Sequence, residues 1–371
     1  MNETHYCHEC ERLLSPEESH EFDGVYLCEE CYRGRTVECD SCGDRIWRED
    51  CESDGTTYLC NRCWSDRYTT CDDCGSFILN DEAYYDDCGD DRYCRECYYK
   101  RKRIPIKSYN YKPTPLFYGG DSDLYLGIEL EIDHGGEDNE NATRLLEIAN
   151  HKSEHMYCKH DGSISSGFEM VSHPMTLSYH KEKMPWNEIF SEAISLDYRS
   201  HNTDTCGLHI HVNRDAFGES EEEQEACISR IVFFVEKHWD DLVQFSRRKL
   251  ANLNRWAARY ATISTTAKET YKKAKDSHAG RYAAVNLTNY ETVEFRLFRG
   301  TLRHETFMAT LQLVAFLCNL SRFCSDRDFE TMSWRDFVLK ISPDKMPELV
   351  SYLKLRQLYV NEPAQAMGEE V

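Results

Sequence analysis

The chain has 371 residues and a formal net charge of −22, and 40% of its residues are apolar. This composition allows a sizeable core and excludes a wholly disordered chain, while the length allows two or three domains. The first hundred residues hold 26 Asp and Glu against 10 Lys and Arg. A surface this acidic repels phosphate backbones, so it argues against nucleic-acid binding there and favours a basic or neutral partner.

The N-terminal residues are polar and lack the apolar stretch of a secretory signal peptide. The longest apolar run, Leu311–Leu320, has about half the length of a membrane span and is interrupted by Gln312 and Asn319. We therefore expect a soluble, cytoplasmic protein without a membrane segment.

Six C-x-x-C pairs fall within residues 1–100 and repeat as three modules. The first pairs of the modules begin at residues 7, 39 and 71, and the second pairs begin at residues 28, 60 and 94. An Asp-Gly step at Asp23 and at Asp54 predicts a tight hairpin turn before the strand that leads into the second pair. The pairs are Cys7/Cys10, Cys28/Cys31, Cys39/Cys42, Cys60/Cys63, Cys71/Cys74 and Cys94/Cys97.

Two C-x-x-C pairs supply the four thiolates of a tetrahedral zinc site, so we predict structural zinc in each module. A disulfide framework is the alternative, but such frameworks belong to secreted proteins. Modules of about 30 residues bury little apolar surface, so zinc binding should supply much of their folding energy. The modules resemble zinc-ribbon or LIM-type knuckles, and the seven-residue gap between them favours three successive sites over interleaved ones. We interpret Cys51, Cys88, His5, His8 and His20 as bystanders, although a histidine could replace a ligand.

Four regions are predicted along the chain. The zinc modules occupy residues 1–100, a linker occupies 101–117, a second domain occupies 118–361, and a tail occupies 362–371. The linker begins within the basic run Lys100–Arg103, which could contact a partner, although a solvated segment is the simpler interpretation.

The first strand of the second domain carries an acidic face. Residues 127–133 read G-I-E-L-E-I-D, in which apolar and acidic side chains alternate strictly, so we predict a strand with one apolar and one acidic face. Glu129 and Glu131 repel each other on that face, and burying them unpaired would be costly. A divalent cation is one possible partner. The alternative is an ordinary strand whose polar face meets water.

Three later stretches have the same character: F-E-M-V-S-H at 168–173, G-L-H-I-H-V at 207–212 and V-E-F-R-L-F-R-G at 293–300. Their polar positions are Glu169, His209, His211, Glu294 and Arg296. Solvated strand faces favour Thr and mixed polar residues rather than this set. If the four strands share a sheet, one face carries a metal- and phosphate-binding set and the other packs on helices.

Helical periodicity and turn residues predict the remaining elements. The Asp161-Gly162 turn predicts a hairpin within residues 157–173, and Asn141 could cap the helix that follows the first strand. Helices are expected at 141–151, 186–198, 221–247, 250–275, 306–323, 334–341 and 347–359. The Arg- and Lys-rich helix at 250–275 could line a nucleotide pocket, but a solvated face is the safer interpretation.

The polar set suits a magnesium triphosphate. Carboxylates suit Mg²⁺, and added imidazole shifts the preference toward Mn²⁺ or Zn²⁺. Four carboxylates carry more negative charge than one hydrolytic zinc needs, and they suit Mg²⁺ ions that also hold a triphosphate. Arg296 and Arg299 would then bind phosphate oxygens. The sequence has no Walker-type phosphate loop and no kinase catalytic loop, so a nucleotide would bind on the sheet through metal ions.

In this order the motifs G-I-E-L-E-I, D-G-S-I with G-F-E-M-V-S-H-P, G-L-H-I-H-V and V-E-F-R-L-F-R-G-T-L resemble the amidoligase family. The resemblance covers about Leu124–Leu320. That family is similar in its catalytic fold to glutamine synthetase and glutamate–cysteine ligase. The resemblance implies an α+β fold, in which an antiparallel sheet has helices on one face and binds ATP and metal ions on the other. It also implies an ATP-dependent ligase that forms an amide or isopeptide bond through an acyl phosphate. A fusion with zinc modules is plausible for bacterial and phage members.

The resemblance also assigns metal ligands. Glu129 and Glu131 would hold separate Mg²⁺ ions. His209 and Glu294 would share the site of Glu129, and Glu169 would share the site of Glu131.

The remaining assignments concern the nucleotide and the substrate. Arg296 would bind the phosphates and stabilise the phosphoryl group during its transfer. His211 and Arg299 are further candidates for the nucleotide site, and Lys159 and Asp161 are candidates for contact with nucleotide or substrate.

Two other functions stay open at this point. One is a metal-dependent hydrolase or phosphotransferase on the same face, and the other is a zinc-module adaptor whose second domain has lost catalysis. Cys206 beside Gly207 suggests a cysteine nucleophile with His209, but a small residue in a strand turn is the simpler interpretation.

Structural zinc does no chemistry, so the modules should recruit a macromolecule, and their acidity favours a basic peptide or protein.

Overall fold

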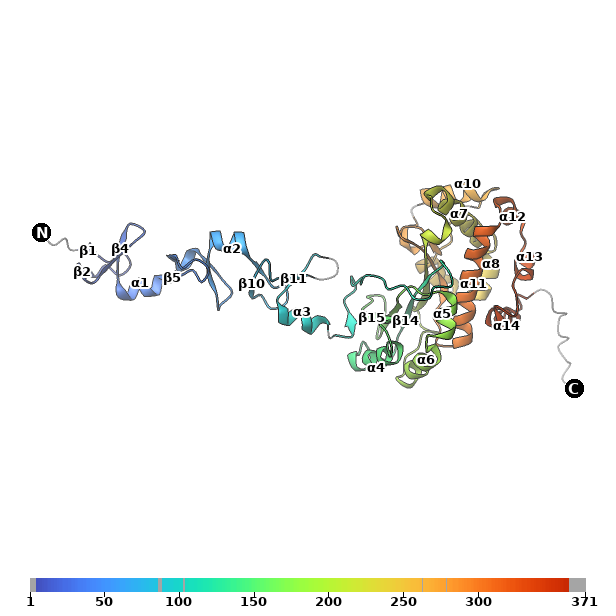
Figure 1. Ribbon diagram of the computed structural model, residues 1–371, viewed down its shortest axis with the longest axis horizontal. Coiled ribbons are helices and arrows are strands. Elements are labelled where there is room, and N and C mark those ends of the chain that lie inside the picture. Colours follow the sequence, from blue (N-terminus) through green and yellow to red (C-terminus); the bar gives the residue numbers. More distant parts are fainter. Residues whose placement is uncertain (1–4, 86–88, 103, 262, 278, 360–371) are drawn as a thin grey trace. The chain divides into compact units, whose positions relative to one another are not determined.

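The computed structural model describes residues 5–85, 89–102, 104–261, 263–277 and 279–359 (Figure 1). The chain divides into two compact units, Met1–Ile104 and Pro105–Val371. Cys88 and the predicted tail at 362–371 lie outside the described residues. Most of the segment predicted as a linker, residues 101–117, falls in the second unit and contributes a short strand to its sheet.

The first unit repeats one arrangement three times: two antiparallel hairpins and then a short helix. In every repeat the first C-x-x-C pair lies between the strands of the first hairpin, and the second pair joins the last strand to the helix. The first repeat comprises β1 (His5–Tyr6), β2 (Leu13–Leu14), β3 (Ser19–Phe22), β4 (Val25–Cys28) and α1 (Glu29–Arg35). The second comprises β5 (Thr36–Glu38), β6 (Arg45–Trp47), β7 (Cys51–Ser53), β8 (Tyr58–Cys60) and α2 (Asn61–Arg67). The third comprises β9 (Tyr68–Thr70), β10 (Phe77–Leu79), β11 (Tyr84–Tyr85), β12 (Arg92–Tyr93) and α3 (Arg95–Lys102).

Successive modules of this unit are joined directly. The gap that the sequence leaves between modules holds the end of a helix and the first strand of the next module, which starts at the residue after that helix ends. Aromatic rings pack at both joints, with ring centroids 5.1 Å apart for Phe22 and Trp47 and 4.3 Å apart for Trp64 and Phe77.

The aspartates of the predicted turns reach across the same joints. The turns form as predicted, with positive φ at Gly24 and Gly55, which glycine adopts without strain. Asp23 accepts a hydrogen bond from Nε1 of Trp47 at 3.1 Å, and Asp54 accepts one from the backbone N–H of Phe77 at 2.8 Å. Each turn therefore stabilises the junction with the next module as well as its own hairpin.

The second unit is built on a seven-stranded sheet in the spatial order β13-β15-β16-β14-β17-β19-β18. Neighbouring strands are antiparallel except for β13 and β15, which are parallel. The strands are β13 (Ile106–Lys107), β14 (Leu126–Ile132), β15 (Met156–Lys159), β16 (Phe168–Ser172), β17 (Gly207–Asn213), β18 (Val285–Asn286) and β19 (Thr292–Arg299). The predicted α+β class, with small cysteine-bearing hairpin modules ahead of a mainly antiparallel sheet and helices, is confirmed.

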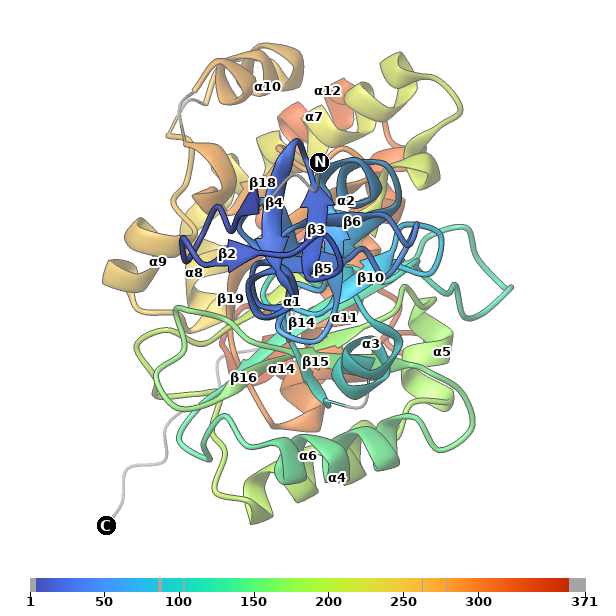
Figure 2. The ribbon, with the colours of Figure 1, turned by 90° about the vertical axis from the view of Figure 1, so that its left-hand side faces the viewer.

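Helices cover the apolar face of this sheet, and α4 and α6 lie side by side at one end of the unit while α7 and α10 lie together at the other (Figure 2). The helices are α4 (Asn139–Ala149), α5 (Leu177–Glu182), α6 (Trp186–Ser195), α7 (Glu221–Lys237), α8 (Trp239–Ser246), α9 (Leu250–Trp256), α10 (Ala267–Asp276), α11 (His304–Phe323), α12 (Asp326–Thr331), α13 (Trp334–Leu339) and α14 (Pro347–Leu355).

The central helix, α11, passes as a membrane span by length and composition alone. However, 67% of its apolar window is buried inside the unit, where it packs against α7 and α14. Burial against other elements of the same fold explains its composition, so α11 is the core helix of the second unit.

Two predicted helices are wrong in extent, and one predicted cap is wrong. The stretch at 221–247 forms α7 and α8, because the backbone leaves helical geometry at His238 before it restarts. The stretch at 250–275 forms α9 and α10, because Ala258 instead bridges to Ala283 beside the sheet. Helix α4 is capped by Asp138, whose carboxylate accepts the backbone N–H groups of Glu140 and Asn141, so Asn141 is inside the helix.

Candidate functional site

The register of the sheet brings the predicted polar residues of four strands onto one face. On β14 and its neighbours, Glu129 lies opposite His209 of β17, and Glu131 lies opposite Glu169 of β16. On β17 and β19, His211 lies opposite Glu294. The alternate positions of β14 and β17 point the other way and form the core: Ile128, Leu130, Ile132, Leu208, Ile210 and Val212 are fully buried. The two faces therefore divide as the alternation predicted.

The polar face forms the floor of a pocket of about 1060 Å³. The predicted site residues that line this pocket are Glu129, Glu131, Lys159, Asp161, Glu169, His209, His211, Glu294 and Arg296. Arg299 does not line it. This guanidinium is half-buried, and burial and then the neighbouring charge of Arg247 lower its pKa, which places it in a separate basic environment.

Glu129 lies at the centre of the polar set. Its carboxylate oxygens lie 3.3 Å from Nδ1 of His209 and 3.3 Å from Nε2 of His211. Glu294 lies 3.7 Å from Nδ1 of His209 and 3.9 Å from Nε2 of His211. The predicted trio of Glu129, His209 and Glu294 is therefore close together, and His211 lies as near to both carboxylates.

Two overlapping groups in this set have the geometry for a metal ion. Glu129, Glu169 and His209 form one, and Glu129, His211 and Glu294 form the other, with the ligand atoms of each group within 4.8 Å of one another. Oxygen and imidazole donors at this spacing fit Mg²⁺ or Mn²⁺. In this arrangement Glu169 groups with Glu129, whereas the sequence prediction grouped it with Glu131.

The carboxylates of the floor perturb one another strongly. Burial alone would raise the pKa of Glu129, but the charge of His211 and the hydrogen bond with His209 outweigh it and hold that pKa well below its ordinary value. Burial raises the pKa of Glu169 well above its ordinary value, and the charge of Glu129 adds to this effect. Lys159 lies 3.2 Å from Glu169 and partly relieves this repulsion. A bound cation would relieve it further.

Glu131 has different surroundings from Glu129. Its side chain accepts a hydrogen bond from the backbone N–H of Gly207, which anchors it to the start of β17. Burial raises its pKa, while the charges of His209 and Arg248 act in the opposite direction.

Glu294 is held by residues that the sequence reasoning missed. Asn286 and Asn289 donate side-chain hydrogen bonds to it at 2.7 and 3.2 Å, and Arg296 donates another. Arg296 also donates from Nε to the backbone carbonyl of Trp256 at 3.4 Å. In the sequence, the sign of these amide groups was the pair of asparagines just ahead of the V-E-F-R strand. The pairing of β18 with β19 places Asn286 opposite Glu294.

Arg248 is a second missed residue. It lines the pocket, is only 5% exposed, and donates from Nη1 to the backbone carbonyl of Arg296 at 2.6 Å. In the sequence it belongs to an R-R-K run after an apolar helix, which is typical of a solvated helix end, and nothing local distinguishes it from Arg247. Arg247 is exposed.

The segment predicted as a linker forms one wall of the pocket. Tyr109, Lys112, Pro113 and Pro115 line it, and the hydroxyl of Tyr109 accepts a hydrogen bond from Arg281 at 2.9 Å. The prolines explain why this wall is an extended strap with few regular hydrogen bonds. The prediction of residues 101–117 as a linker did not include this contribution to the pocket.

Cys206 does not have the environment of a nucleophile. It is buried, and burial raises the pKa of its thiol to about 12, so the thiolate is scarce at neutral pH. The interpretation of Cys206 as a small residue beside the strand fits these surroundings.

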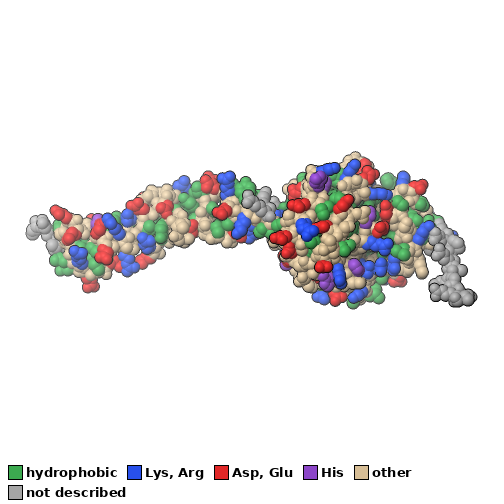
Figure 3. Space-filling model, turned by 90° about the horizontal axis from the view of Figure 1, so that it is seen from below, with side chains coloured by type: hydrophobic (Ala, Val, Ile, Leu, Met, Phe, Trp, Pro, Cys, Tyr) green, Lys and Arg blue, Asp and Glu red, His purple; other side chains and the backbone are tan. Residues whose placement is uncertain are grey.

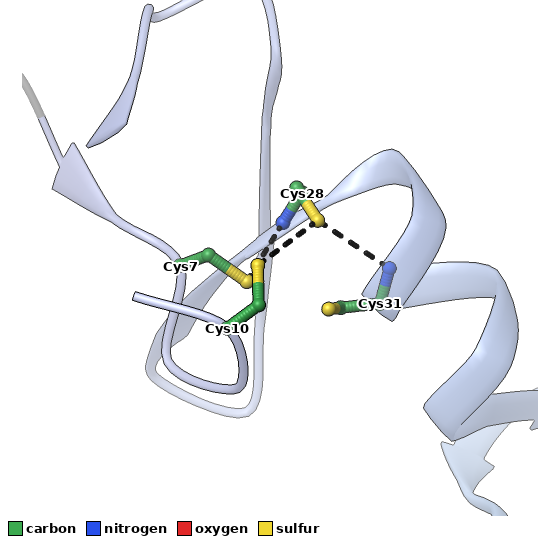
Figure 4. Close-up of side chains that lie close together, drawn as sticks. All are labelled: Cys7, Cys10, Cys28 and Cys31. Atoms are coloured by element: carbon green, nitrogen blue, oxygen red, sulfur yellow. Dashed lines mark hydrogen bonds between the residues drawn. The ribbon is translucent and has the colours of Figure 1, made fainter. Parts of the chain in front are cut away.

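The twelve paired cysteines of the first unit form three separate clusters of four, in chain order. Figure 4 shows the first cluster, in which Cys7, Cys10, Cys28 and Cys31 lie close together. Sulfur atoms from the two pairs of a module lie 3.7 Å apart for Cys10 and Cys28 and 3.9 Å apart for Cys42 and Cys60. Tetrahedral zinc at a Zn–S distance of about 2.3 Å separates its thiolates by roughly 3.8 Å. The clusters are compatible with structural zinc, and the preference for successive over interleaved sites is confirmed.

In the first cluster the surroundings of Cys7 favour the thiolate, whereas those of Cys10 and Cys31 raise the pKa of the thiol. Burial alone would raise the pKa of Cys7, but backbone N–H groups that include those of Cys10 and Cys28 lower it to about 6. Cys51 lies outside the clusters and donates to the backbone carbonyl of Arg48 at 3.0 Å, and His5 stacks on Tyr26. These two residues have local partners that account for them without zinc.

Part of the second unit is similar to a known protein family. Residues 147–317 match the family model described as "Putative amidoligase enzyme". The matched segment runs from the end of α4 into α11, so it contains Glu169, His209, Glu294 and Arg296 but begins after Glu129 and Glu131. A search of the curated proteins finds no match.

Proposed function

We propose that the protein is an ATP-dependent carboxylate–amine ligase, because residues 147–317 match the family model described as "Putative amidoligase enzyme". Its substrate would be a peptide, a protein or an amine-bearing small molecule. The observation that carries this proposal is the convergence of carboxylates, imidazoles and guanidinium groups on the floor of one pocket of about 1060 Å³. A pocket of this size can hold a nucleotide and a second substrate together.

The donor set fits a divalent cation, Mg²⁺ or Mn²⁺. Glu129, Glu169 and His209 would hold one ion, and Glu129, His211 and Glu294 are placed for another. When bound, such an ion neutralises the charge of the β- and γ-phosphates of ATP. Burial and then the charge of Glu129 raise the pKa of Glu169, which supports a cation beside these two carboxylates.

The residues of the chain would then position and activate two substrates. An oxygen of the acid attacks the γ-phosphorus of ATP, forming a carbon–oxygen–phosphorus link as the bond to ADP breaks. The amine nitrogen attacks the carbonyl carbon, the bond to phosphate breaks, and the amine loses a proton to solvent. Arg296, held by Glu294 and by the carbonyl of Trp256, would stabilise negative charge on the transferred group.

The walls of the pocket support this chemistry. The strap around Tyr109, tied to Arg281, shields the floor from one side, and a water-poor site protects a reactive acyl phosphate from hydrolysis. The rings of Trp256 and Tyr282, with centroids 5.7 Å apart, give the pocket an aromatic side against which a base could stack.

The first unit would recruit the substrate that is not the nucleotide. Acidic and basic side chains are interspersed on the face of this unit seen in Figure 3, so the acidic groups do not form a single patch on that face. A basic or neutral peptide is the partner that this surface fits, and its thiolate clusters suit the reducing cytoplasm.

The test is the mass of the product. The protein is incubated with Mg-ATP and a panel of acid–amine pairs, and mass spectrometry looks for a product equal to acid plus amine minus water. The proposal requires ADP in equal amount to product, and ADP release that needs both partners. ADP release with water alone would instead indicate a hydrolase, and absence of Mg-ATP binding in calorimetry would indicate an adaptor.

A further inference from the structure

Arg248 is a buried cation without an ionic partner. Its side chain is 5% exposed, and among the described residues no carboxylate lies within 4.0 Å of it. Nη1 is satisfied by the carbonyl of Arg296, whereas Nε has no hydrogen-bond partner. Burying a guanidinium in this state is costly unless a partner arrives to pair with it. The charge of Glu131 acts on Arg248 from a distance, and a ligand anion would supply a direct partner.

A second buried nitrogen without a partner among the described residues lies beside Arg248, and it carries the ring proton when Nδ1 binds a metal ion. His209 directs Nδ1 toward Glu129, and its Nε2 is buried without a hydrogen-bond partner. Because Nδ1 lies on the side of the carboxylates, Nε2 is left to face the side of Arg248. The two groups line the same pocket.

Gly207 places the two donors next to one space. A Cβ atom built on Gly207 would lie 2.9 Å from Nε2 of His209 and 3.3 Å from Nη1 of Arg248. Any larger residue would therefore crowd both donors and close the space between them. Thr205, two residues earlier, also lines the pocket at this point. We call the space bounded by Gly207, His209 and Arg248 the cradle.

We propose that the cradle binds an oxyanion of the reacting substrates, with Arg248 and Nε2 of His209 as its hydrogen-bond donors. The inference rests on the proposed ligase function, which it deepens. Guanidinium binds planar and tetrahedral oxyanions through paired N–H groups, so the ligand is either the γ-phosphoryl group of ATP or the carboxylate of the acid. Arg296 already donates from Nη1 to Glu294 and from Nε to a backbone carbonyl, whereas Nε of Arg248 has no hydrogen-bond partner among the described residues.

The first test compares nucleotides on the full-length protein. Calorimetry measures Mg²⁺ with AMP-PNP and Mg²⁺ with ADP, for the parent, Arg248→Met and the control Arg247→Met, whose side chain is exposed. If the ligand is the phosphoryl group, Arg248→Met weakens AMP-PNP binding roughly 10- to 100-fold and leaves ADP binding unchanged, since ADP lacks that group. Arg247→Met should match the parent.

The second arm tests the acid. If the ligand is the carboxylate, Arg248→Met binds both nucleotides as the parent does, while the KM for the acid found in the product screen rises roughly 10- to 100-fold. Arg248→Lys keeps the charge but lacks the paired donors, so it should recover only part of the loss in either arm.

A third variant keeps both donors and fills the space. Gly207→Ala should reproduce the loss seen with Arg248→Met, while Gly120→Ala, at an exposed position where a Cβ meets nothing within 4 Å, should not. Circular dichroism and thermal unfolding check that each variant is folded. Parent-like nucleotide affinity, kcat and KM in folded Arg248→Met would overturn the cradle and leave the ligase proposal intact. A parent that neither binds Mg-AMP-PNP nor turns over would overturn both.

Discussion

The two units of the chain maintain their folds by different means. The second unit has an extensive apolar core between its sheet and helices. The first unit has small buried clusters, one made of Cys7, Leu14, Leu27 and Cys28 and another of Cys39, Leu59 and Cys63. These clusters include cysteines of the proposed zinc sites. In the first unit the same residues therefore form the core and bind the metal. In the second unit the metal-binding groups lie on a sheet that is already stabilised from its other face.

The largest expected effect follows from that difference. Removing zinc with a chelator should unfold the first unit and leave the second folded, because structural zinc contributes on the order of 10 kcal/mol to small modules and no comparable core replaces it. Hydrogen exchange followed by mass spectrometry gives the protection of each unit separately. Loss of protection should be confined to residues before about 104.

Substitutions of single cysteines make the same test more specific. Cys39→Ser should lower the zinc content by about one ion per chain and unfold its module, whereas Cys51→Ser should change neither, because Cys51 lies outside the clusters. A first unit that keeps its exchange protection after complete zinc removal would show that its small clusters suffice, and the contrast between the units would be lost.

In the second unit, the loss of a metal ligand should separate activity from stability. Glu129→Ala should reduce ATP turnover at least about a thousandfold while the unit stays folded, because the apolar core on the other face of the sheet is unchanged. The measurements are ADP release and thermal unfolding of the variant in parallel. The control is Glu188→Gln on the exposed face of α6, which should retain parent activity. Retained turnover by Glu129→Ala would remove Glu129 from the site.

Much of this architecture was accessible from the pattern of residues. Strict alternation identified β14, β17 and β19, since one pleat separates each polar side chain from the next and the apolar positions must be buried. The cysteine spacing gave three modules because zinc geometry admits few arrangements. Alternation could not show which carboxylates share an ion, since that depends on distances between side chains of neighbouring strands. The grouping of Glu169 with Glu131 came from the family resemblance, and these two residues do lie opposite each other in the sheet.

Other parts depend on contacts that no local pattern contains. Arg248 and Arg247 are adjacent and chemically identical, and only the path of the chain after α8 buries one and exposes the other. The strap at Tyr109 reads as a proline-rich linker because its partner, Arg281, lies far along the sequence. The break between α9 and α10 reflects a bridge to the sheet that overrides helix propensity.

A smaller effect is the pH dependence of the stability of the second unit. His180 and His238 are buried in the second unit, and burial lowers the pKa of each to about 4. The unfolded chain binds protons on these imidazoles below about pH 6.5 and the folded unit does not, so stability is lost as pH falls from 6.5 toward 4. Each histidine should contribute roughly 2 kcal/mol of this loss by pH 5. Denaturant unfolding at pH 7 and pH 5 should show a smaller loss for His180→Leu, and an unchanged loss for His151→Leu at an exposed position.

The smallest predicted effect concerns the joints of the first unit. Asp54 accepts the backbone N–H of Phe77 in the next module, and this hydrogen bond is the main cause of its lowered pKa. Asp54→Ala should therefore weaken the joint by about 1 kcal/mol without releasing zinc, because the four thiolates of each module remain in place. The measurement is the exchange rate of the Phe77 amide, which should rise several-fold, with Asp66→Ala on the exposed side of α2 as the matched control. If the amide of Phe77 exchanges equally slowly in Asp54→Ala, ring packing of Trp64 on Phe77 alone holds the joint.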